Sequence, residues 1–429
     1  MAMKRYIKNI ALLAVAALGF AACEDYPDAF VQADGVPTVH YVRYADNDQL
    51  IDQAYMGEIV CFVGDNLCSV HELWFNDKQA LLNTSFMTEH TLIAAVPKEL
   101  SANPTDKVYM ITAAQDTVTL DFKVMLPVPV IKSMSCEMQP AGEEVTIYGD
   151  YFKEPLTIDF ANTTVTEIKS LSMTEITFVI PEGSKPGKIK VTTESGVSQS
   201  PFMYMDNRGL ITDFDGGTDI VPQGWNFSGT YSSEGGISGN YVELKSANPL
   251  TADGAWNEDF KIDFWCGVWD GNPMGLTGGA GVPICNIIDF TDFANMCLKF
   301  ELFIPSSNPW KSGALQLIFA SADKAANDSW QNNTFVQASA NDAAGLDLCR
   351  GLYRPWEATG SFDTGDKWIT VTVPFSEFTY NADGTPGKVP LSKPEDFASF
   401  VIYAWSGGVN GEECTPVFRI DNLRAVPVK

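Results

Sequence analysis

Histidine is scarce in this chain of 429 residues, and so are the other patterns that metal sites and hydrolytic triads need. The three histidines are His40, His71 and His90, and none lies in the last 220 residues. The sequence also contains no CxxC pair and no cluster of Cys and His. Zinc sites are built from such clusters, and a Ser/His/Asp triad needs a histidine base. Neither kind of site is therefore expected.

Basic residues are few as well, with 28 Lys and Arg against 54 Asp and Glu, which gives a formal net charge of −26. A surface of this sign repels phosphate backbones, so the composition argues against nucleic-acid binding.

Long apolar runs are missing too, and the one apolar segment that stands out lies at the N-terminus. The segment Ile10–Leu18 is about half of the roughly 20 residues that span a bilayer. Cationic residues precede it, and Gly19-Phe20-Ala21-Ala22-Cys23 follows it. This order is typical of a secretory signal that ends in a lipobox. We expect residues 1–22 to be removed and Cys23 to carry lipid.

The residues after Cys23 are acidic, beginning Glu24-Asp25-Tyr26-Pro27-Asp28, and residues 23–36 are expected to form a tether. The whole segment resembles the export signal that sends lipoproteins of the Bacteroidota to the outer face of the outer membrane. The resemblance implies a lipid-anchored protein that faces the cell exterior. The alternative is a lipoprotein that faces the periplasm.

Eight cysteines remain once Cys23 is set aside. An even number in an exported chain permits disulfides, but a chain of this length builds its cores without them, and the spacings match no dense disulfide framework. We expect buried free thiols.

An internal repeat organises the first half of the chain. The segment Gly57–Leu67 (GEIVCFVGDNL) aligns with Gly142–Phe152 (GEEVTIYGDYF) at an offset of 85 residues. Both copies alternate apolar and polar residues in short runs, the pattern of antiparallel strands with one buried face. Gly64 and Gly149 are expected where the backbone turns sharply at a strand end.

The repeated pattern resembles the IPT/TIG immunoglobulin-like family. The resemblance implies two β-sandwich modules, residues 37–127 and 128–205, that act as spacers. Pro127-Val128-Pro129 and the region of Pro201 are expected to be stiff joints, because proline fixes φ and restricts its neighbour.

The second half holds nine of the ten tryptophans and several short alternating runs that predict strands. We expect one larger β-sandwich over residues 206–429, which makes the fold all-β throughout. The opening DFDGG (213–217), the closing FRIDNL (418–423) and the tryptophan-rich loops resemble the C-terminal domain of surface glycan-binding proteins.

That resemblance implies a sandwich like that of a carbohydrate-binding module, without catalysis. It implies a polysaccharide ligand, with a β-glucan such as xyloglucan favoured, and a TonB-dependent glycan transporter complex as partner.

Tryptophan suits such a ligand, because a flat ring covers the apolar face of a pyranose with little loss of side-chain entropy. Loop context predicts an exposed platform formed by Trp330, Tyr353 and Trp356, with Trp310 as a further candidate. Side chains beside these rings are expected to bond the sugar hydroxyls, namely Arg354, Gln331 and Asn332. By contrast, Trp265, Trp368 and Trp405 lie in hydrophobic surroundings and are expected in the core.

Three further hypotheses remain open. Asp213, Asp215 and Asp421 could hold a structural calcium ion if the first and last strands of the sandwich pair, since calcium prefers oxygen ligands. A glycoside hydrolase needs only two carboxylates about 5 to 10 Å apart, although no local motif pairs acids here. An adhesin that binds protein through the immunoglobulin-like modules would leave the loop tryptophans unexplained.

Overall fold

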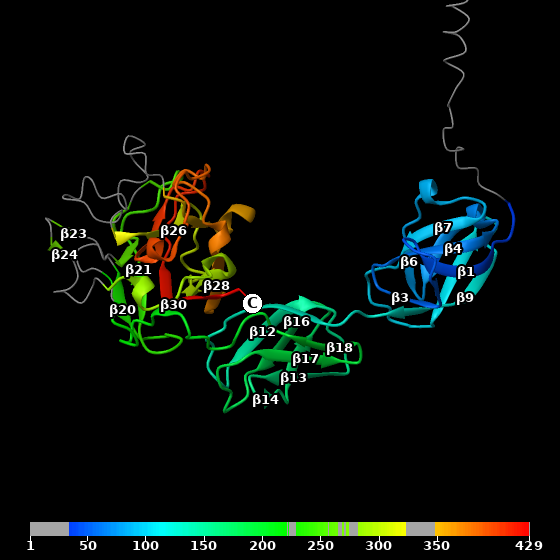
Figure 1. Ribbon diagram of the computed structural model, residues 1–429, viewed down its shortest axis with the longest axis horizontal. Coiled ribbons are helices and arrows are strands. Elements are labelled where there is room, and N and C mark those ends of the chain that lie inside the picture. Colours follow the sequence, from blue (N-terminus) through cyan, green and yellow to red (C-terminus); the bar gives the residue numbers. More distant parts are fainter. Residues whose placement is uncertain are drawn as a thin grey trace, which may run out of the picture. The chain divides into compact units, whose positions relative to one another are not determined.

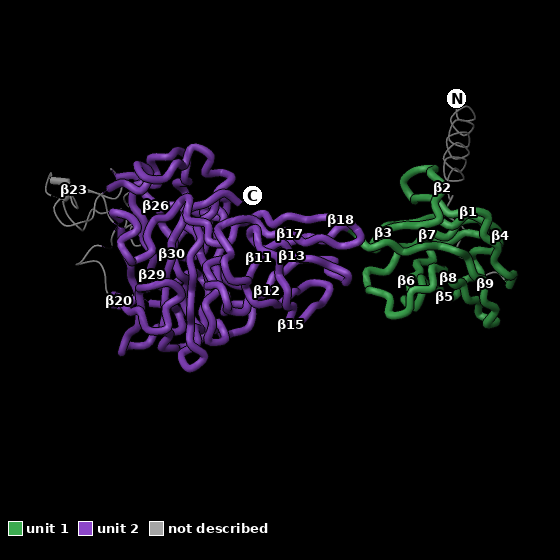
Figure 2. Tube along the Cα trace, turned by 90° about the horizontal axis from the view of Figure 1, so that it is seen from below, with its two compact units in different colours: residues 1–127 green, residues 128–429 purple. Residues whose placement is uncertain are grey.

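The computed structural model describes residues 34–220, 222, 229–255, 257–264, 268–269, 272–273, 282–322 and 348–428 (Figure 1). The chain divides into two compact units, residues 1–127 and 128–429 (Figure 2). The described residues form many short strands, which confirms the predicted all-β fold. None of them belongs to a helix long and apolar enough to cross a membrane.

The first unit contains the first module, a sandwich of two four-stranded sheets. One sheet has the order β2-β1-β4-β7, formed by β1 (Thr38–Tyr44), β2 (Leu50–Ile51), β4 (Ile59–Asp65) and β7 (Thr91–Ala95). The other has the order β6-β5-β8-β9, formed by β5 (Val70–Phe75), β6 (Lys78–Ala80), β8 (Lys107–Thr112) and β9 (Thr117–Asp121). A short parallel pair joins β3 (Gln53–Tyr55) to β10 (Lys123–Met125). Alternate residues such as Val60 and Phe62 point into the core between the sheets.

The second module repeats this design at the start of the second unit. One sheet has the order β11-β12-β16-β15, formed by β11 (Val130–Met134), β12 (Glu144–Asp150), β15 (Ile168–Leu171) and β16 (Glu175–Val179). The other has the order β14-β13-β17-β18, formed by β13 (Leu156–Phe160), β14 (Thr163–Thr164), β17 (Ile189–Thr193) and β18 (Gly196–Gln199). Val145 and Ile147 occupy the core positions that Val60 and Phe62 hold in the first module.

Two repeat-related glycines show why the sequence pattern recurs. A side chain at Gly64 would place its Cβ 1.8 Å from the carbonyl oxygen of Thr38, and one at Gly149 would place it 1.9 Å from that of Val130. Neither glycine has a positive φ. The expectation of a sharp turn is therefore wrong: glycine is needed because a neighbouring strand passes too close for any Cβ.

The C-terminal sandwich packs a six-stranded sheet and a four-stranded sheet around one hydrophobic core. The first sheet has the order β20-β21-β30-β25-β28, with β19 also on β30, and its strands are β19 (Leu210–Thr212), β20 (Thr230–Ser232), β21 (Tyr241–Leu244), β25 (Met296–Phe303), β28 (Ile369–Pro374) and β30 (Phe418–Pro427). The second has the order β22-β29-β26-β27, and its strands are β22 (Lys261–Phe264), β26 (Ala314–Ala320), β27 (Gly351–Tyr353) and β29 (Ser399–Trp405). We call these the β30 sheet and the β29 sheet. A further short hairpin joins β23 (Val268–Trp269) to β24 (Asn272–Pro273).

Short 3₁₀ helices connect the strands. They are η1 (Leu67–Ser69), η2 (Thr84–Phe86), η3 (Ile284–Asn286), η4 (Phe293–Asn295), η7 (Pro355–Ala358), η8 (Phe375–Glu377) and η9 (Pro394–Phe397). The seven cysteines among the described residues are all free, and all but Cys285 are buried, in line with the predicted free thiols.

Candidate functional site

The structure describes only some of the residues of the predicted aromatic platform. Trp330, Gln331 and Asn332 lie outside the described residues. Trp310 and Trp356 do not form an exposed platform, because they are only 0% and 3% exposed and belong to the core of the C-terminal sandwich. The prediction that both rings face solvent is wrong.

Local structure explains why these two rings turn inward. Pro355 begins the 3₁₀ helix η7, which directs Trp356 under β26, where its indole nitrogen donates to the carbonyl of Gly313 at 2.6 Å. The indole nitrogen of Trp310 donates to the carbonyl of Ser312 at 2.6 Å. A buried indole is stable only when its N–H has such an acceptor.

Tyr353 and Arg354 are also engaged by the protein itself. Tyr353 lies half-buried on the inner side of β27, with its ring 6.1 Å from that of Trp310, and burial raises the pKa of its phenol to about 12. Arg354 Nε pairs with Glu357 Oε2 at 2.6 Å, and Nη1 donates to the carbonyl of Gly407. These two residues brace the edge of the β29 sheet and do not converge on a ligand.

The carboxylates proposed for calcium are used by the fold as well. The condition set for this site is met, because β19 pairs with β30, which brings Asp213 and Asp215 close enough to influence Asp421. However, Asp213 accepts from the amides of Asp215 and Gly217, and Asp215 accepts from Asn240. Across the described residues, no group of three or more His, Cys, Asp or Glu side chains could hold a metal ion. The geometry gives the calcium hypothesis no support.

The outer side of the β29 sheet carries a pair of stacked rings and several polar side chains, most of them buried. Phe400, Ile402 and Ala404 of β29 point into the core. By alternation, Tyr403 and Trp405 lie on the opposite face, where their rings stack at 5.8 Å and 29°. Among the tryptophan side chains that the structure describes in the C-terminal sandwich, Trp405 alone is more than 9% exposed.

Polar side chains flank these rings on the same face. Arg350, which is fully buried, donates through Nη1 to Gln316 Oε1 at 2.7 Å and to the Tyr403 hydroxyl at 3.2 Å. Gln316 donates to the carbonyls of Ala382 and Trp405 at 3.0 and 2.8 Å. The Nη2 atom of Arg350 is buried and has no hydrogen-bond partner. The network therefore holds Tyr403 and Trp405 in place, and the Nη2 donor of Arg350 is left without a hydrogen-bond acceptor among the described residues.

The next strand adds two charged groups to this face. Register places Lys261 of β22 beside Tyr403, and Asp263 beside Val401. Both side chains are less than 10% exposed. Tyr403 is itself only 3% exposed and lies in a buried cluster with Leu348 and Val401, so of the two rings only Trp405 reaches the surface. The half-buried Trp405 ring suits the apolar face of a pyranose, and the buried polar side chains beside it hold its strand in place. We call Trp405, Tyr403, Gln316, Arg350 and Lys261 the β29 face.

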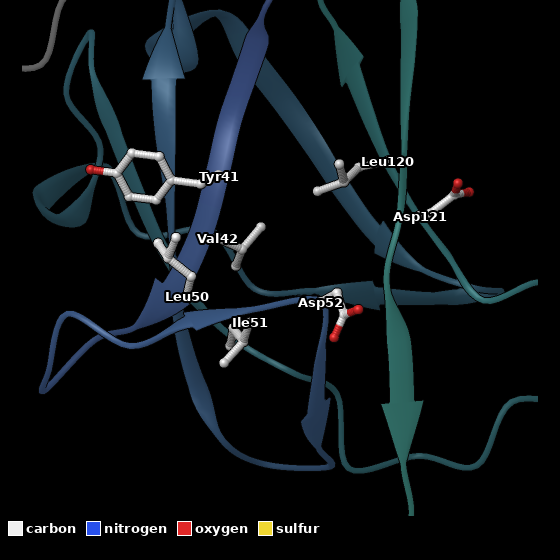
Figure 3. A pocket seen from close by; sticks show the side chains of 7 residues that line it. All are labelled: Tyr41, Val42, Leu50, Ile51, Asp52, Leu120 and Asp121. Atoms are coloured by element: carbon white, nitrogen blue, oxygen red, sulfur yellow. The ribbon is translucent and has the colours of Figure 1, made fainter.

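The first module has a groove of about 410 Å³ that lacks this arrangement (Figure 3). It is lined by Tyr41, Val42, Leu50, Ile51, Asp52, Leu120 and Asp121. Figure 3 shows that Tyr41 and Asp121 point outward on opposite sides, so the ring and the carboxylate do not converge.

Comparison with known proteins connects the C-terminal sandwich to a family. The sequence model described as the surface glycan-binding protein B xyloglucan binding domain matches residues 204–427. The chain belongs to the surface glycan-binding protein B family. The IPT/TIG domain model matches residues 129–204 of this family member.

Two relatives extend the family match over nearly the whole chain. The crystal structure of the surface glycan-binding protein PbSGBP-B from Prevotella bryantii is 36% identical, with a TM-score of 0.71, and the match covers 92% of this chain and 100% of that one. An IPT/TIG domain-containing protein from Bacteroides ovatus is 21% identical over 442 residues, which cover 96% of this chain and 81% of the relative. The resemblance inferred from the second glycine repeat and the C-terminal motifs is therefore confirmed, and the first repeat shares the sandwich fold.

Sequence analysis placed Trp405 in the core because of the hydrophobic run around it, whereas the ring is half-buried and packs against the smaller cluster on the outer side of the β29 sheet. The period-two alternation of the same run held the correct signal. Since Ile402 and Ala404 face inward, Trp405 has to face outward, and Ser406-Gly407-Gly408 ends the strand directly after it.

Proposed function

We propose that this protein binds a polysaccharide without cleaving it and holds it at the cell surface for import. The match of residues 204–427 to a family described by xyloglucan binding carries this proposal. The similarity to a surface glycan-binding protein at 36% identity supports it. A β-glucan is the favoured ligand class, and xyloglucan is the first member to test.

Within the C-terminal sandwich, we propose the β29 face as a glycan contact surface. Trp405 supplies a half-buried ring, and the buried side chains of Tyr403, Gln316 and Arg350 support its position. Trp330 remains a second candidate for ring stacking.

The mature chain is proposed to be anchored in the outer membrane through lipid on Cys23, facing the cell exterior. The small residues before Cys23 and the acidic residues after it support this location. A TonB-dependent transporter complex is the proposed partner that receives the glycan, as the family resemblance implies.

Affinity electrophoresis through gels that contain single polysaccharides tests the proposal. Xyloglucan, mixed-linkage glucan, β-1,3-glucan and mannan should be compared, with the intact mature protein beside Trp405→Ala, Trp330→Ala and Tyr231→Ala. Tyr231 is a matched control, because its ring is 51% exposed but lies on β20 of the opposite sheet. Reducing ends should be assayed in parallel.

We expect retardation by one β-glucan, loss of retardation in Trp405→Ala, no change in Tyr231→Ala and a constant number of reducing ends. Loss in Trp330→Ala alone would move the site away from the β29 face. Release of reducing ends would favour the glycoside hydrolase instead. No retardation by any glycan would favour the adhesin.

A further inference from the structure

The second module covers the outer face of the β30 sheet, on the side of the sandwich away from the β29 face. Cys136 of the second module joins Ile237, Tyr241 and Trp368 of the sandwich in one buried cluster. Met138 and Phe303 pack against this cluster from the two sides. The indole nitrogen of Trp368 donates to the carbonyl of Gly235 at 2.9 Å, which holds its ring in the contact.

A buried ionic network crosses the same contact. Glu137 of the second module lies 2.5 Å from Lys299 of β25 and 3.1 Å from Arg424 of β30. Arg424 also binds Glu301 of β25 through two hydrogen bonds, at 2.7 and 3.0 Å. None of these four side chains is more than 6% exposed. Two cations and two carboxylates therefore balance only when Glu137 is in place.

Thr370 of β28 ties the backbones of the two parts together. Its amide donates to the carbonyl of Ser135 at 3.0 Å, and its hydroxyl accepts from the amide of Glu137 at 2.7 Å. The same hydroxyl donates to Glu301 Oε1 at 2.8 Å. The second module is thereby linked, through the Thr370 hydroxyl, to the Glu301 carboxylate that Arg424 also binds.

From these contacts we infer that the second module and the C-terminal sandwich form one cooperative folding unit, joined by the Glu137–Arg424–Glu301–Lys299 network. Removing one partner of a buried ion pair leaves the other charge unpaired in a low-dielectric site. The two family models meet at residue 204. A C-terminal sandwich without the second module would nevertheless expose the Trp368 ring and leave Lys299 without its partner Glu137. The second module is therefore a structural part of the same folding unit as the C-terminal sandwich and does not act as a mobile spacer.

A consequence for binding rests on the proposed function. Since the β29 face and the β30 sheet are opposite walls of one sandwich, the network fixes the orientation of a bound glycan relative to the second module. The folding inference itself does not depend on glycan binding.

Hydrogen exchange of the mature protein, measured by mass spectrometry along a urea series, tests the inference. Peptides that contain Glu137 and peptides that contain Thr370 should open with the same midpoint and the same urea dependence. Glu137→Ala should accelerate exchange of both by ~100-fold, because an unpaired buried charge is strongly destabilising. Glu144→Ala, an exposed glutamate on β12 of the same module, should leave both unchanged.

Separate openings in the unsubstituted protein, with the Glu137 peptide exposed while the Thr370 peptide stays protected, would overturn the inference. An effect of Glu137→Ala confined to the second module would overturn it as well. Should Glu137→Ala fail to fold, the urea series on the unsubstituted protein decides alone. Failure of glycan binding in electrophoresis leaves this readout untouched, so the two proposals fail independently.

Discussion

Asp421 illustrates how strongly position changes the chemistry of a single residue. Its side chain is fully buried, with Oδ1 accepting from the amide of Asn422 at 2.7 Å and Oδ2 lacking a partner. Burial raises the pKa of this carboxyl to about 8, with the nearby charges of Glu301, Asp215 and Asp213 acting in the same direction. The group is therefore protonated in the folded chain at neutral pH.

This raised pKa makes stability depend on pH in a defined direction. The carboxyl of an unfolded aspartate has a pKa of about 3.9. Between that pH and pH 8, the folded state therefore binds more protons than the unfolded state. The contribution of Asp421 to the free energy of unfolding is fully present below the unfolded pKa and falls as pH rises toward the folded pKa. We expect the free energy of unfolding of Asp421→Asn to lose this dependence on pH. At pH 8.5 it should exceed that of the unsubstituted protein by about 2 kcal/mol.

Urea unfolding at pH 5, 7 and 8.5 measures the Asp421 effect. Asp159→Asn, an exposed residue of β13, serves as the control and should leave the slope unchanged. Equal slopes for Asp421→Asn and the unsubstituted protein would mean that the carboxyl ionises without cost.

Trp356 and Trp405 should respond to truncation in opposite ways. Trp356→Ala removes a core ring and leaves the Gly313 carbonyl without its donor, so we expect a loss of about 3 to 5 kcal/mol in the free energy of unfolding. Trp405→Ala removes a half-buried ring and should cost less stability while abolishing glycan retardation. Circular dichroism during denaturation, run beside affinity electrophoresis, separates the two effects. If Trp356→Ala kept its free energy of unfolding but lost glycan retardation, Trp356 would belong to the glycan-binding site after all.

At the scale of the element, the paired glycines explain why β4 and β12 carry the same motif. Each strand crosses close to a backbone carbonyl of its neighbour, β1 in the first module and β11 in the second. Apolar alternation alone would tolerate alanine at Gly64 and Gly149, but the spacing between the strands does not.

We expect Gly64→Ala and Gly149→Ala each to lower stability by about 1 to 3 kcal/mol, because a strand must shift to admit the new Cβ. Calorimetry should assign the Gly64 effect to residues 34–127 and the Gly149 effect to the unit that follows Pro127. Gly187→Ala is a matched control, since its nearest contact would lie at an ordinary 3.5 Å. Unchanged transitions in both variants would refute the close-approach explanation.

At the scale of the whole molecule, the net charge and the proposed lipid anchor have opposite effects on membrane attachment. A chain with a net charge of −26 is repelled by an anionic membrane surface, so stable attachment needs acyl chains. We expect Cys23→Ser to leave the membrane pellet in fractionated cells, whereas the unsubstituted protein should stay in it at high salt. Cys285→Ser, at a half-buried thiol far along the chain, should fractionate like the unsubstituted protein. Retention of Cys23→Ser in the pellet would contradict lipid anchoring.

The all-β fold, the module repeat and the family follow from the sequence by itself. Strand alternation, turn residues and the motif around Gly64 and Gly149 are local patterns, and local patterns can be read without coordinates. The segments of β19 and β30 are both predicted as strands from their alternation, and only the structure shows that β19 pairs with β30.

Tertiary structure alone decided which rings face solvent and which charges meet. Trp356 follows a proline in a polar loop, yet in η7 its ring packs into the core of the sandwich. The Gly313 carbonyl accepts the hydrogen bond of its indole N–H in that position. Glu137 and Arg424 are 287 residues apart and meet only because the second module packs on the β30 sheet. Burial and pairing depend on contacts between distant segments, and no single stretch of sequence contains that information.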